Sequence, residues 1–151
     1  MKLNPKLIIV GGLVYYVAQF IVSFVTGPLI HEGVLDEAYR ANASFWRPEL
    51  VQDPPDMAAL MPRWITTGLI SALLAAAVYD NIRDAFEGPG AVKGMKFGLV
   101  AFIFYGSFAA GWSGVFNLPE SIWVWWVFEG IFYFLAGGAA LGWTVSRLAP
   151  E

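Results

Sequence analysis

Four long apolar segments, separated by polar stretches of unequal length, run along this chain of 151 residues. Each segment is close to the roughly 20 residues that a helix needs to cross the hydrocarbon core of a bilayer. The apolar residues are continuous and do not alternate with polar ones, a pattern that favours helices over a barrel. The predicted spans are residues 7–29, 64–82, 95–116 and 122–146. We therefore expect an all-α membrane protein, folded as one antiparallel bundle of four transmembrane helices over residues 1–151.

The stretches between the spans predict how the helices connect. The third and fourth spans are joined by the short turn Asn117–Glu120, so these two helices should be antiparallel neighbours. The one larger loop covers residues 31–63, where six acidic residues outnumber three arginines. Within this loop, residues 34–45 predict a short amphipathic helix at the membrane surface. Asp56 is a candidate N-cap for the short turn that follows it.

Composition supports the membrane assignment and excludes several kinds of site. The chain is 58% apolar and 14% charged, whereas soluble domains have about 25% charged residues. The absence of cysteine excludes disulfides, thiolate chemistry and iron–sulfur clusters. His31 is the single histidine, so the sequence offers no histidine cluster for haem, and we predict no metal site. The net charge of −3 gives no reason to expect nucleic acid as a partner.

The distribution of Lys and Arg predicts how the spans are oriented. With both termini on one side, that side holds six basic residues and the other side holds three. The six are Lys2, Lys6, Arg83, Lys93, Lys96 and Arg147, and the three are Arg40, Arg47 and Arg63. Because cytoplasmic loops are enriched in Lys and Arg, we expect both termini in the cytoplasm, and the chain in a bacterial inner membrane.

Glu129 is the most informative single residue, because it lies inside the apolar fourth span. A carboxylate in a membrane-spanning helix is costly unless it is protonated, paired or hydrated, so it marks a functional or assembly site by default. Helical periodicity places Tyr133 on the same face of the span. We expect this face to meet other helices and not lipid.

The other spans supply polar side chains at a similar depth. Tyr15, Gln19 and Ser23 share one face of the first span, and Ser71 lies on the second. A helix rises about 1.5 Å per residue, so alternating helix directions bring Gln19, Ser23 and Ser71 to a depth similar to that of Glu129. The predicted intramembrane polar layer consists of Glu129, Gln19, Ser23, Ser71, Tyr15 and Tyr133.

Small residues predict where the helices pack against one another. Gly106, Ala110 and Gly114 recur at every fourth position of the third span, and Gly130 and Gly137 flank the face of Glu129 on the fourth. Small side chains let helix backbones approach closely inside a membrane. We therefore expect these five positions to form helix contacts, within this chain or with another membrane protein.

Several roles remain open for Glu129. It is a candidate proton or cation site, a ligand-binding acid or an assembly contact. A simpler interpretation is a protonated side chain that hydrogen-bonds to Gln19 or Ser71 and only stabilises the bundle. A metal site at His31 and Glu32 is a weak alternative, because one histidine with scattered acids is a common arrangement.

Two classes of function are consistent with this pattern. The first is a non-catalytic accessory or scaffold subunit of a larger membrane complex, which binds another membrane protein or a second copy through small-residue faces and the acidic loop. The alternative is a small transporter or a binder of an amphiphile such as a quinone, lipid or pigment, with Glu129, Gln19, Tyr15 and Tyr133 at its site. An enzyme, the third possibility, would use Glu129 or the His31–Glu32 region as acid or base.

Overall fold

The computed structural model describes residues 4–149, and within this range it is helical and contains no β-strand. The long helices are α1 (Pro5–Leu29), α4 (Met57–Ile82), α5 (Gly90–Ser113) and α6 (Glu120–Leu148). All four are long and apolar enough to cross a membrane. The predicted helical class is confirmed, and each of the four predicted spans coincides largely with one of these helices. Their insertion in a membrane stays a prediction. Lys2, which entered the orientation argument, lies outside the described residues.

The first helix continues beyond its predicted end at residue 29. A π-helical turn, η1 (Ile30–Val34), follows α1 directly, and in it the Leu35 N–H donates to the carbonyl of Ile30 at 2.8 Å. Pro28 lies just before this turn and has no N–H to donate. The wider turn lets the chain remain helical past the proline and reach the loop.

The second long helix begins earlier than predicted, at Met57 instead of residue 64. The side chain of Asp56 accepts a hydrogen bond from the Ala59 N–H at 3.1 Å and so caps the whole of α4. Pro62 therefore lies inside the helix and does not precede it. The predicted cap is confirmed, and the helix that it starts is much longer than the expected turn.

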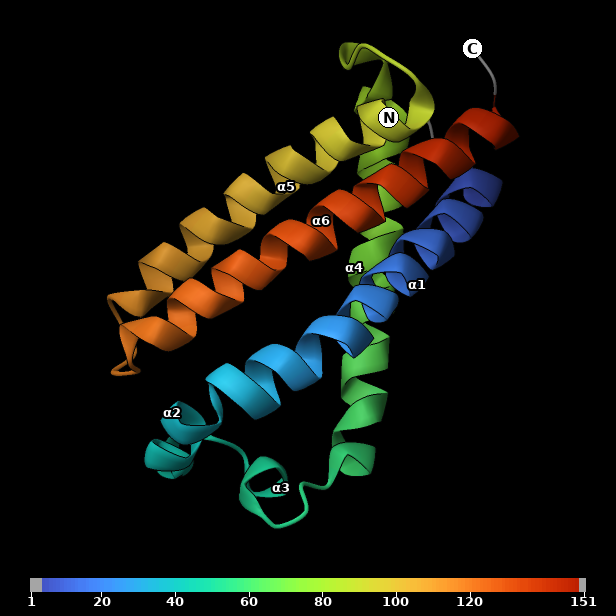
Figure 1. The fold of residues 1–151 in the computed structure, drawn as a ribbon. Coiled ribbons are helices and arrows are strands. Elements are labelled where there is room, and N and C mark those ends of the chain that lie inside the picture. Colours follow the sequence, from blue (N-terminus) through green and yellow to red (C-terminus); the bar gives the residue numbers. More distant parts are fainter. Residues whose placement is uncertain (1–3, 150–151) are drawn as a thin grey trace.

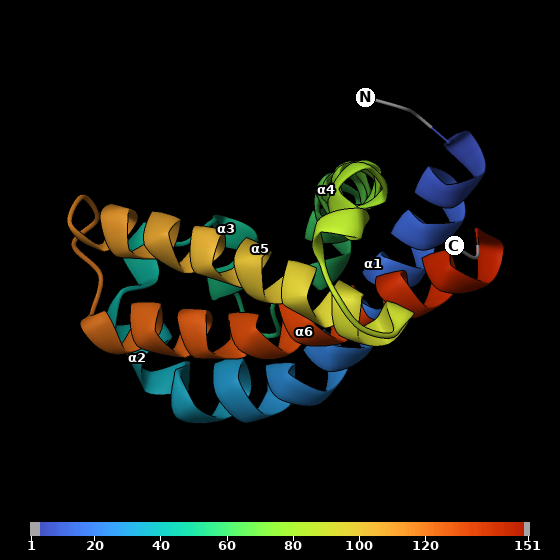
Figure 2. The ribbon, with the colours of Figure 1, turned by 90° about the horizontal axis from the view of Figure 1, so that it is seen from above.

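The helices do not all pack against one another. Figures 1 and 2 show α5 and α6 side by side in opposite directions, with α1 packed on α6 and α4 packed on α1. In Figure 1, α4 crosses the other helices at a steep angle, and its first half diverges from α5 and α6. Both chain ends lie near the last turns of α4 and α6, at what we call the termini end. The opposite end, with the α5–α6 turn and the loop, is called the loop end.

At the termini end the four helices converge on a hydrophobic core. Its buried residues are Leu7, Tyr15, Ala72, Ala76, Tyr79, Phe97, Leu141 and Val145. Alanine and glycine bring the helices close: a Cβ added to Gly12 would lie 3.0 Å from the Cα of Leu73 on α4. This contact fixes α4 against α1 near the middle of both helices.

The close contact between α5 and α6 uses a different set of glycines from the one predicted. A Cβ on Gly94 would lie 1.9 Å from the carbonyl oxygen of Gly138, so no side chain fits there. The residues at this contact are Gly90, Gly94 and Gly98 of α5 and Gly138 and Gly142 of α6. The two backbones therefore touch along the termini end of the hairpin.

Of the predicted packing residues, three face another helix of this chain. Gly130 faces the ring of Tyr105, Gly137 faces Tyr15 and Gln19, and Gly106 faces Val127 of α6. The other two, Ala110 and Gly114, are exposed on α5. Their packing against another chain stays a prediction.

A second core holds the loop onto the start of α6. It is built from Ile30, Leu35, Leu118 and Ile122, with a rim of aromatic side chains around it. The loop contains α2 (Asp36–Ala41), η2 (Ala43–Phe45) and α3 (Pro48–Val51), so the single helix expected over residues 34–45 is two shorter ones. This core places α2 beside the buried carboxylate of α6.

Candidate functional site

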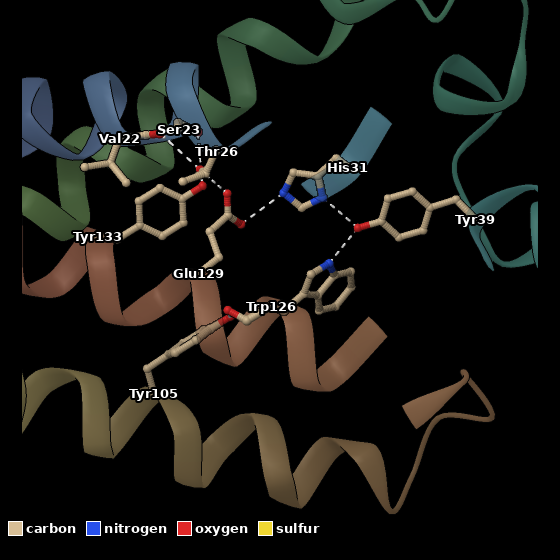
Figure 3. Close-up of polar contacts among 9 residues, drawn as sticks. All are labelled: Val22, Ser23, Thr26, His31, Tyr39, Tyr105, Trp126, Glu129 and Tyr133. Carbon is tan, nitrogen blue, oxygen red and sulfur yellow. Dashed lines mark hydrogen bonds and ion pairs between the residues drawn. The ribbon is translucent and has the colours of Figure 1, made fainter. Parts of the chain in front are cut away.

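Glu129 lies at the centre of a hydrogen-bonded cluster between α6, α1 and the loop (Figure 3). Its side chain is only 4% exposed. One carboxylate oxygen, Oε2, lies 3.0 Å from His31 Nε2, and the other is hydrogen-bonded to the hydroxyl of Thr26. A buried carboxylate needs such partners, because an unpaired charge in an apolar interior is strongly destabilising.

The π-helical turn places His31 next to this carboxylate. In an α-helix, Thr26 would share its face with residue 30, and His31 would point elsewhere. The extra residue of the π turn spaces the shared face by five, so both Thr26 and His31 contact Glu129. The His31 side chain is 36% exposed, so the cluster reaches the surface of the molecule toward the loop end.

The loop contributes a second hydrogen-bonded shell around His31. Trp126 Nε1 donates to the hydroxyl oxygen of Tyr39 at 2.7 Å, and the same hydroxyl lies 2.7 Å from His31 Nδ1. Since the Tyr39 oxygen accepts from Trp126, its own proton is free to point to Nδ1. In neutral His31 the ring proton is then on Nε2, where it donates to Glu129.

Burial raises the pKa of the Tyr39 phenol, and the negative charge of Glu129 acts in the same direction, whereas the hydrogen bond from Trp126 lowers it. The phenol is consequently protonated at neutral pH and is available as a donor to His31. Trp46 supports this position, because its Nε1 donates to the backbone carbonyl of Tyr39 at 2.9 Å. The orientation of the histidine thus depends on the folding of the loop.

On its other side the cluster reaches the space between the helices. Tyr133 is one turn along α6 from Glu129, and Figure 3 shows its hydroxyl pointing to the same region as Thr26. This hydroxyl lies 3.3 Å from the hydroxyl of Ser23 on α1, and either group is able to donate. Ser23 and Tyr133 also line a cavity, so the cluster and the cavity share two side chains.

The cavity lies where α4 diverges from the other helices and has a volume of about 440 Å³. Aromatic rings form most of its wall, and the polar groups are one amide and several hydroxyls. The lining residues are Tyr16, Gln19, Phe20, Ser23, Met61, Trp64, Ile65, Tyr105, Tyr133 and Phe134. None of these lining side chains carries a charge at neutral pH, and the cavity is an open cleft and not an enclosed void.

The predicted polar layer is only partly assembled. The structure brings Ser23 and Tyr133 to the region of Glu129. Gln19 lines the cleft, while Tyr15 is buried in the core of the termini end, and both contact Gly137. Ser71 is exposed on α4, and no hydrogen bond within residues 4–149 joins it to Glu129.

Four residues of the cluster were absent from the predicted layer: Thr26, His31, Tyr39 and Trp126. Thr26 had a usable signal, since it follows Ser23 by three positions and shares its helix face. His31 was considered as a weak metal ligand and, with Glu32, as an acid or base, but not as a partner of Glu129. Residues 4–149 contain no group of three or more His, Asp or Glu that would hold a metal ion. For Tyr39 no local signal exists, because its contact depends on how the loop folds back.

Comparisons of the chain with protein-family models, with curated proteins and with solved structures found no match. Its two distinctive features are the buried Glu129–His31 pair and the aromatic cleft beside it. Since they share Ser23 and Tyr133, they form one candidate site.

Proposed function

We propose that this chain binds an amphiphilic molecule from the membrane in the cleft between α4 and helices α1, α5 and α6. The cleft of about 440 Å³ is the observation that carries the proposal. Small-molecule sites typically have about 300–1,000 Å³, mainly apolar and aromatic walls, and a few polar groups that orient the ligand. The cleft beside Tyr133 has this composition.

The lining separates into parts that suit the two ends of an amphiphile. Phe20, Ile65 and Phe134 offer apolar surface for a hydrocarbon or ring system. Gln19, Ser23 and Tyr133 offer donors and acceptors for a polar head group. Trp64 is 41% exposed on α4, so the cleft is accessible from the side that faces lipid in a membrane. A quinone, a lipid or a pigment has this division between head and tail.

Position in the membrane supports the same proposal. Four helices are long and apolar enough to cross a membrane, which supports an integral membrane protein. We propose that the helices alternate in direction as an antiparallel bundle, with both termini in the cytoplasm of a bacterium and the chain in its inner membrane. The support is the excess of Lys and Arg at the termini end. The cleft then opens to the bilayer, where an amphiphile is concentrated.

The experiment that tests this function is native mass spectrometry of the chain purified in a mild detergent, with an absorbance spectrum and analysis of the organic extract. We expect a bound amphiphile in the unaltered protein. Ser23→Trp should fill the cleft and remove the ligand. Ser71→Trp is the matched control, because Ser71 is exposed on α4 outside the cleft lining, and it should retain the ligand.

Two results would contradict the proposal. One is an unaltered protein that carries no hydrophobic molecule and takes up no added quinone or lipid analogue. The other is equal retention of the ligand in Ser23→Trp and Ser71→Trp, which would mean that the molecule lies on the general lipid-facing surface. Circular dichroism of both variants checks that the helices remain folded.

A second candidate, the accessory subunit, is favoured by the outer face of α5. A Cβ added to Gly111 would have no neighbouring atom within 4 Å, and Ala110 and Gly114 are exposed beside it. A shallow hollow on this face is lined by Phe104, Ser107, Phe108, Gly111, Trp112 and Val115. A helix of another membrane protein, or of a second copy, would be able to approach α5 closely here.

A native gel of mild-detergent extracts tests this second candidate. Migration in a large assembly that is lost in Ala110→Leu would support it, since the larger side chain blocks close approach at the outer face of α5. Migration as a single chain, unchanged by the substitution, would contradict it. The acidic loop is a weaker partner surface, because Asp36 and Glu49 already pair with Arg40 and Arg47 at 2.8 Å.

A further inference from the structure

We infer that the cleft takes an uncharged amphiphile whose head group is a flat ring bearing oxygen atoms, as in a quinone or its quinol, and not a phospholipid. The inference rests on the proposed function and names its ligand class. It is carried by three features of the cleft. Its lining has no charged side chain, its polar groups lie near the middle of two long helices, and its walls are rich in aromatic rings.

The lining of the cleft offers no counter-charge for a charged head group. Within the described part of the chain, no Lys, Arg, Asp or Glu is among the residues that line it. Arg63 precedes Trp64 on α4, but it is exposed and lies outside the lining. Moving a phosphate from water into such a site without a partner is strongly unfavourable. The lining therefore suits an uncharged head group.

The polar groups of the cleft lie far from the ends of their helices. Tyr133 lies about 20 Å along α6 from Glu120 and about 22 Å from Leu148, at about 1.5 Å per residue. Gln19 lies about 21 Å along α1 from Pro5 and about 15 Å from Leu29 at the same rise. The hydrocarbon core of a bilayer is about 30 Å thick, and phospholipid head groups lie outside it. In a membrane-spanning arrangement these side chains therefore meet the head group of a molecule that is held within the core.

The polar side chains suit the oxygens of such a ring. The amide of Gln19 has both donors and acceptors, so it is able to donate to the carbonyl oxygen of a quinone or the hydroxyl oxygen of a quinol. The hydroxyls of Ser23 and Tyr133 lie 3.3 Å apart. Whichever of the two donates, Ser23 keeps at least one lone pair that accepts from a ligand hydroxyl. Both redox forms of the ring therefore find partners.

The walls of the cleft favour a flat ring over an alkyl chain. Six of the ten lining residues are aromatic. Tyr16 and Phe20 pair on α1 with ring centroids 6.4 Å apart, and Tyr105 of α5 pairs with Phe134 of α6 at 5.5 Å. Rings at such separations attract one another through tilted, offset and edge-to-face contacts. A flat ligand ring makes these contacts as well, whereas an acyl chain gains apolar contact alone.

The test compares three amphiphiles with the same decyl tail and different head groups: decylbenzoquinone, decanol and decyl phosphate. Equilibrium binding of each to the purified full chain is measured in a neutral detergent, and Ser23→Trp supplies the blank for sites outside the cleft. The readout is the affinity for the unaltered chain divided by the affinity for Ser23→Trp, which cancels the partitioning of each probe into detergent. We expect a ratio of about tenfold or more for decylbenzoquinone, a smaller one for decanol, and no difference for decyl phosphate.

Gln19→Leu tests the hydrogen bond to the ring with little change in side-chain size. We expect the affinity for decylbenzoquinone to fall by about tenfold, because a ring oxygen loses its donor. Gln52→Leu is the matched control, since Gln52 is exposed in the loop and lies outside the lining, and it should bind as the unaltered chain does. Circular dichroism checks the fold. If Gln19→Leu does not fold, the comparison of the three probes decides.

Three results would overturn the inference and leave the proposed function standing, because the cleft would still bind an amphiphile. One is decyl phosphate bound in the cleft as tightly as decylbenzoquinone. Another is equal binding of decanol, and the third is a folded Gln19→Leu that binds decylbenzoquinone as the unaltered chain does. If no probe distinguishes the unaltered chain from Ser23→Trp, the inference fails. The proposed function fails with it unless another amphiphile is retained through purification.

Discussion

The buried side chain of Glu129 depends on a hydrogen-bond partner at each of its two oxygens. His31 Nε2 and the Thr26 hydroxyl occupy its two oxygens, and both come from the α1–η1 segment. Hydrogen bonds to a charged group contribute about 1.5–3 kcal/mol each, and leaving a buried charge without one is more costly still. The stability of the contact between α1 and α6 therefore depends on polar groups as well as on apolar packing.

Replacing Thr26 by Val tests this dependence with almost no change in side-chain volume. We expect the free energy of unfolding to fall by roughly 1–3 kcal/mol, because one oxygen of Glu129 loses its donor. The measurement is denaturant unfolding in detergent, followed by circular dichroism. Thr67→Val is the control, since the Thr67 hydroxyl donates only to carbonyls of its own helix. Equal losses in both variants would contradict the expectation.

The tautomer of His31 is open to direct observation, because the chain contains a single histidine. Nitrogen NMR of ¹⁵N-labelled protein should show the ring proton of neutral His31 on Nε2. Tyr39→Phe removes the hydroxyl that fixes Nδ1 as the acceptor, so we expect a mixture of tautomers in this variant. A proton found on Nδ1 in the unaltered protein would refute the hydrogen-bond assignment.

At the scale of elements, the molecule is a tightly packed hairpin with two helices added to it. Glycine contacts join α5 to α6 so closely that the backbones touch, and α1 then packs on α6. Within residues 4–149, α4 packs closely on only one other long helix, α1. It is therefore the long helix with the fewest packing contacts. This difference in packing is what leaves the cleft open at the loop end.

Gly94→Ala tests the glycine contact in the hairpin. The added Cβ would lie 1.9 Å from the Gly138 carbonyl oxygen, so the helices must separate. Overpacking of this kind typically costs about 1–3 kcal/mol, and we expect a matching loss in denaturant unfolding. Gly111→Ala is the control, because no atom lies within 4 Å of its added Cβ. A fully stable Gly94→Ala would contradict the observed approach of the backbones.

Much of the element structure was predictable from the sequence, since hydropathy determines spanning length and short turns determine neighbours. The α5–α6 glycine contact was missed for a specific reason. The third span was predicted from residue 95, so Gly90 and Gly94 were assigned to the preceding loop. Hydropathy is low at these glycines and near Lys93, although the helix already begins at Gly90.

The candidate site was predictable only in part. Periodicity placed Glu129, Ser23 and Tyr133 on facing surfaces, because each lies within regular α-helix. It missed His31, because the first span was predicted to end at residue 29, whereas a π turn continues the helix through Ile30–Val34 and brings His31 onto the face of Thr26. Tyr39 depends on long-range folding of the loop, which no local pattern in the sequence describes.

At the scale of the whole molecule, the two ends differ in the loops that they carry and in their number of basic residues. Both chain ends and the α4–α5 loop lie at one end, and the α5–α6 turn and the 35–56 loop lie at the other (Figures 1 and 2). The excess of basic residues lies at the termini end. The positive-inside rule therefore predicts that this end is cytoplasmic.

Single cysteines test this orientation cleanly, because the natural chain has none. We expect a membrane-impermeant maleimide to label Asp53→Cys in intact cells, and Glu87→Cys only after the membrane is opened. Both positions are exposed, so access within the protein is similar. The unaltered chain gives the background. Labelling of Glu87→Cys in intact cells would reverse the orientation, and labelling of both would contradict the spanning arrangement.

The 26-residue helix α4 is attached to α1 well away from its first residue. One close contact is that of Gly12 with Leu73, and about 16 residues, or roughly 24 Å, separate Leu73 from the tip of α4 at Met57. A rotation of α4 by about 10° about this contact would move the tip by roughly 4 Å at the same rise per residue. The tip is also tied to the loop, because the Asp56 N–H donates to the carbonyl of Glu49 at 2.8 Å. The width of the cleft thus follows the angle between α4 and α1. A guest that changed this angle would also move the first residues of α4 and the Glu49 carbonyl bonded to them, in the loop that contains Tyr39.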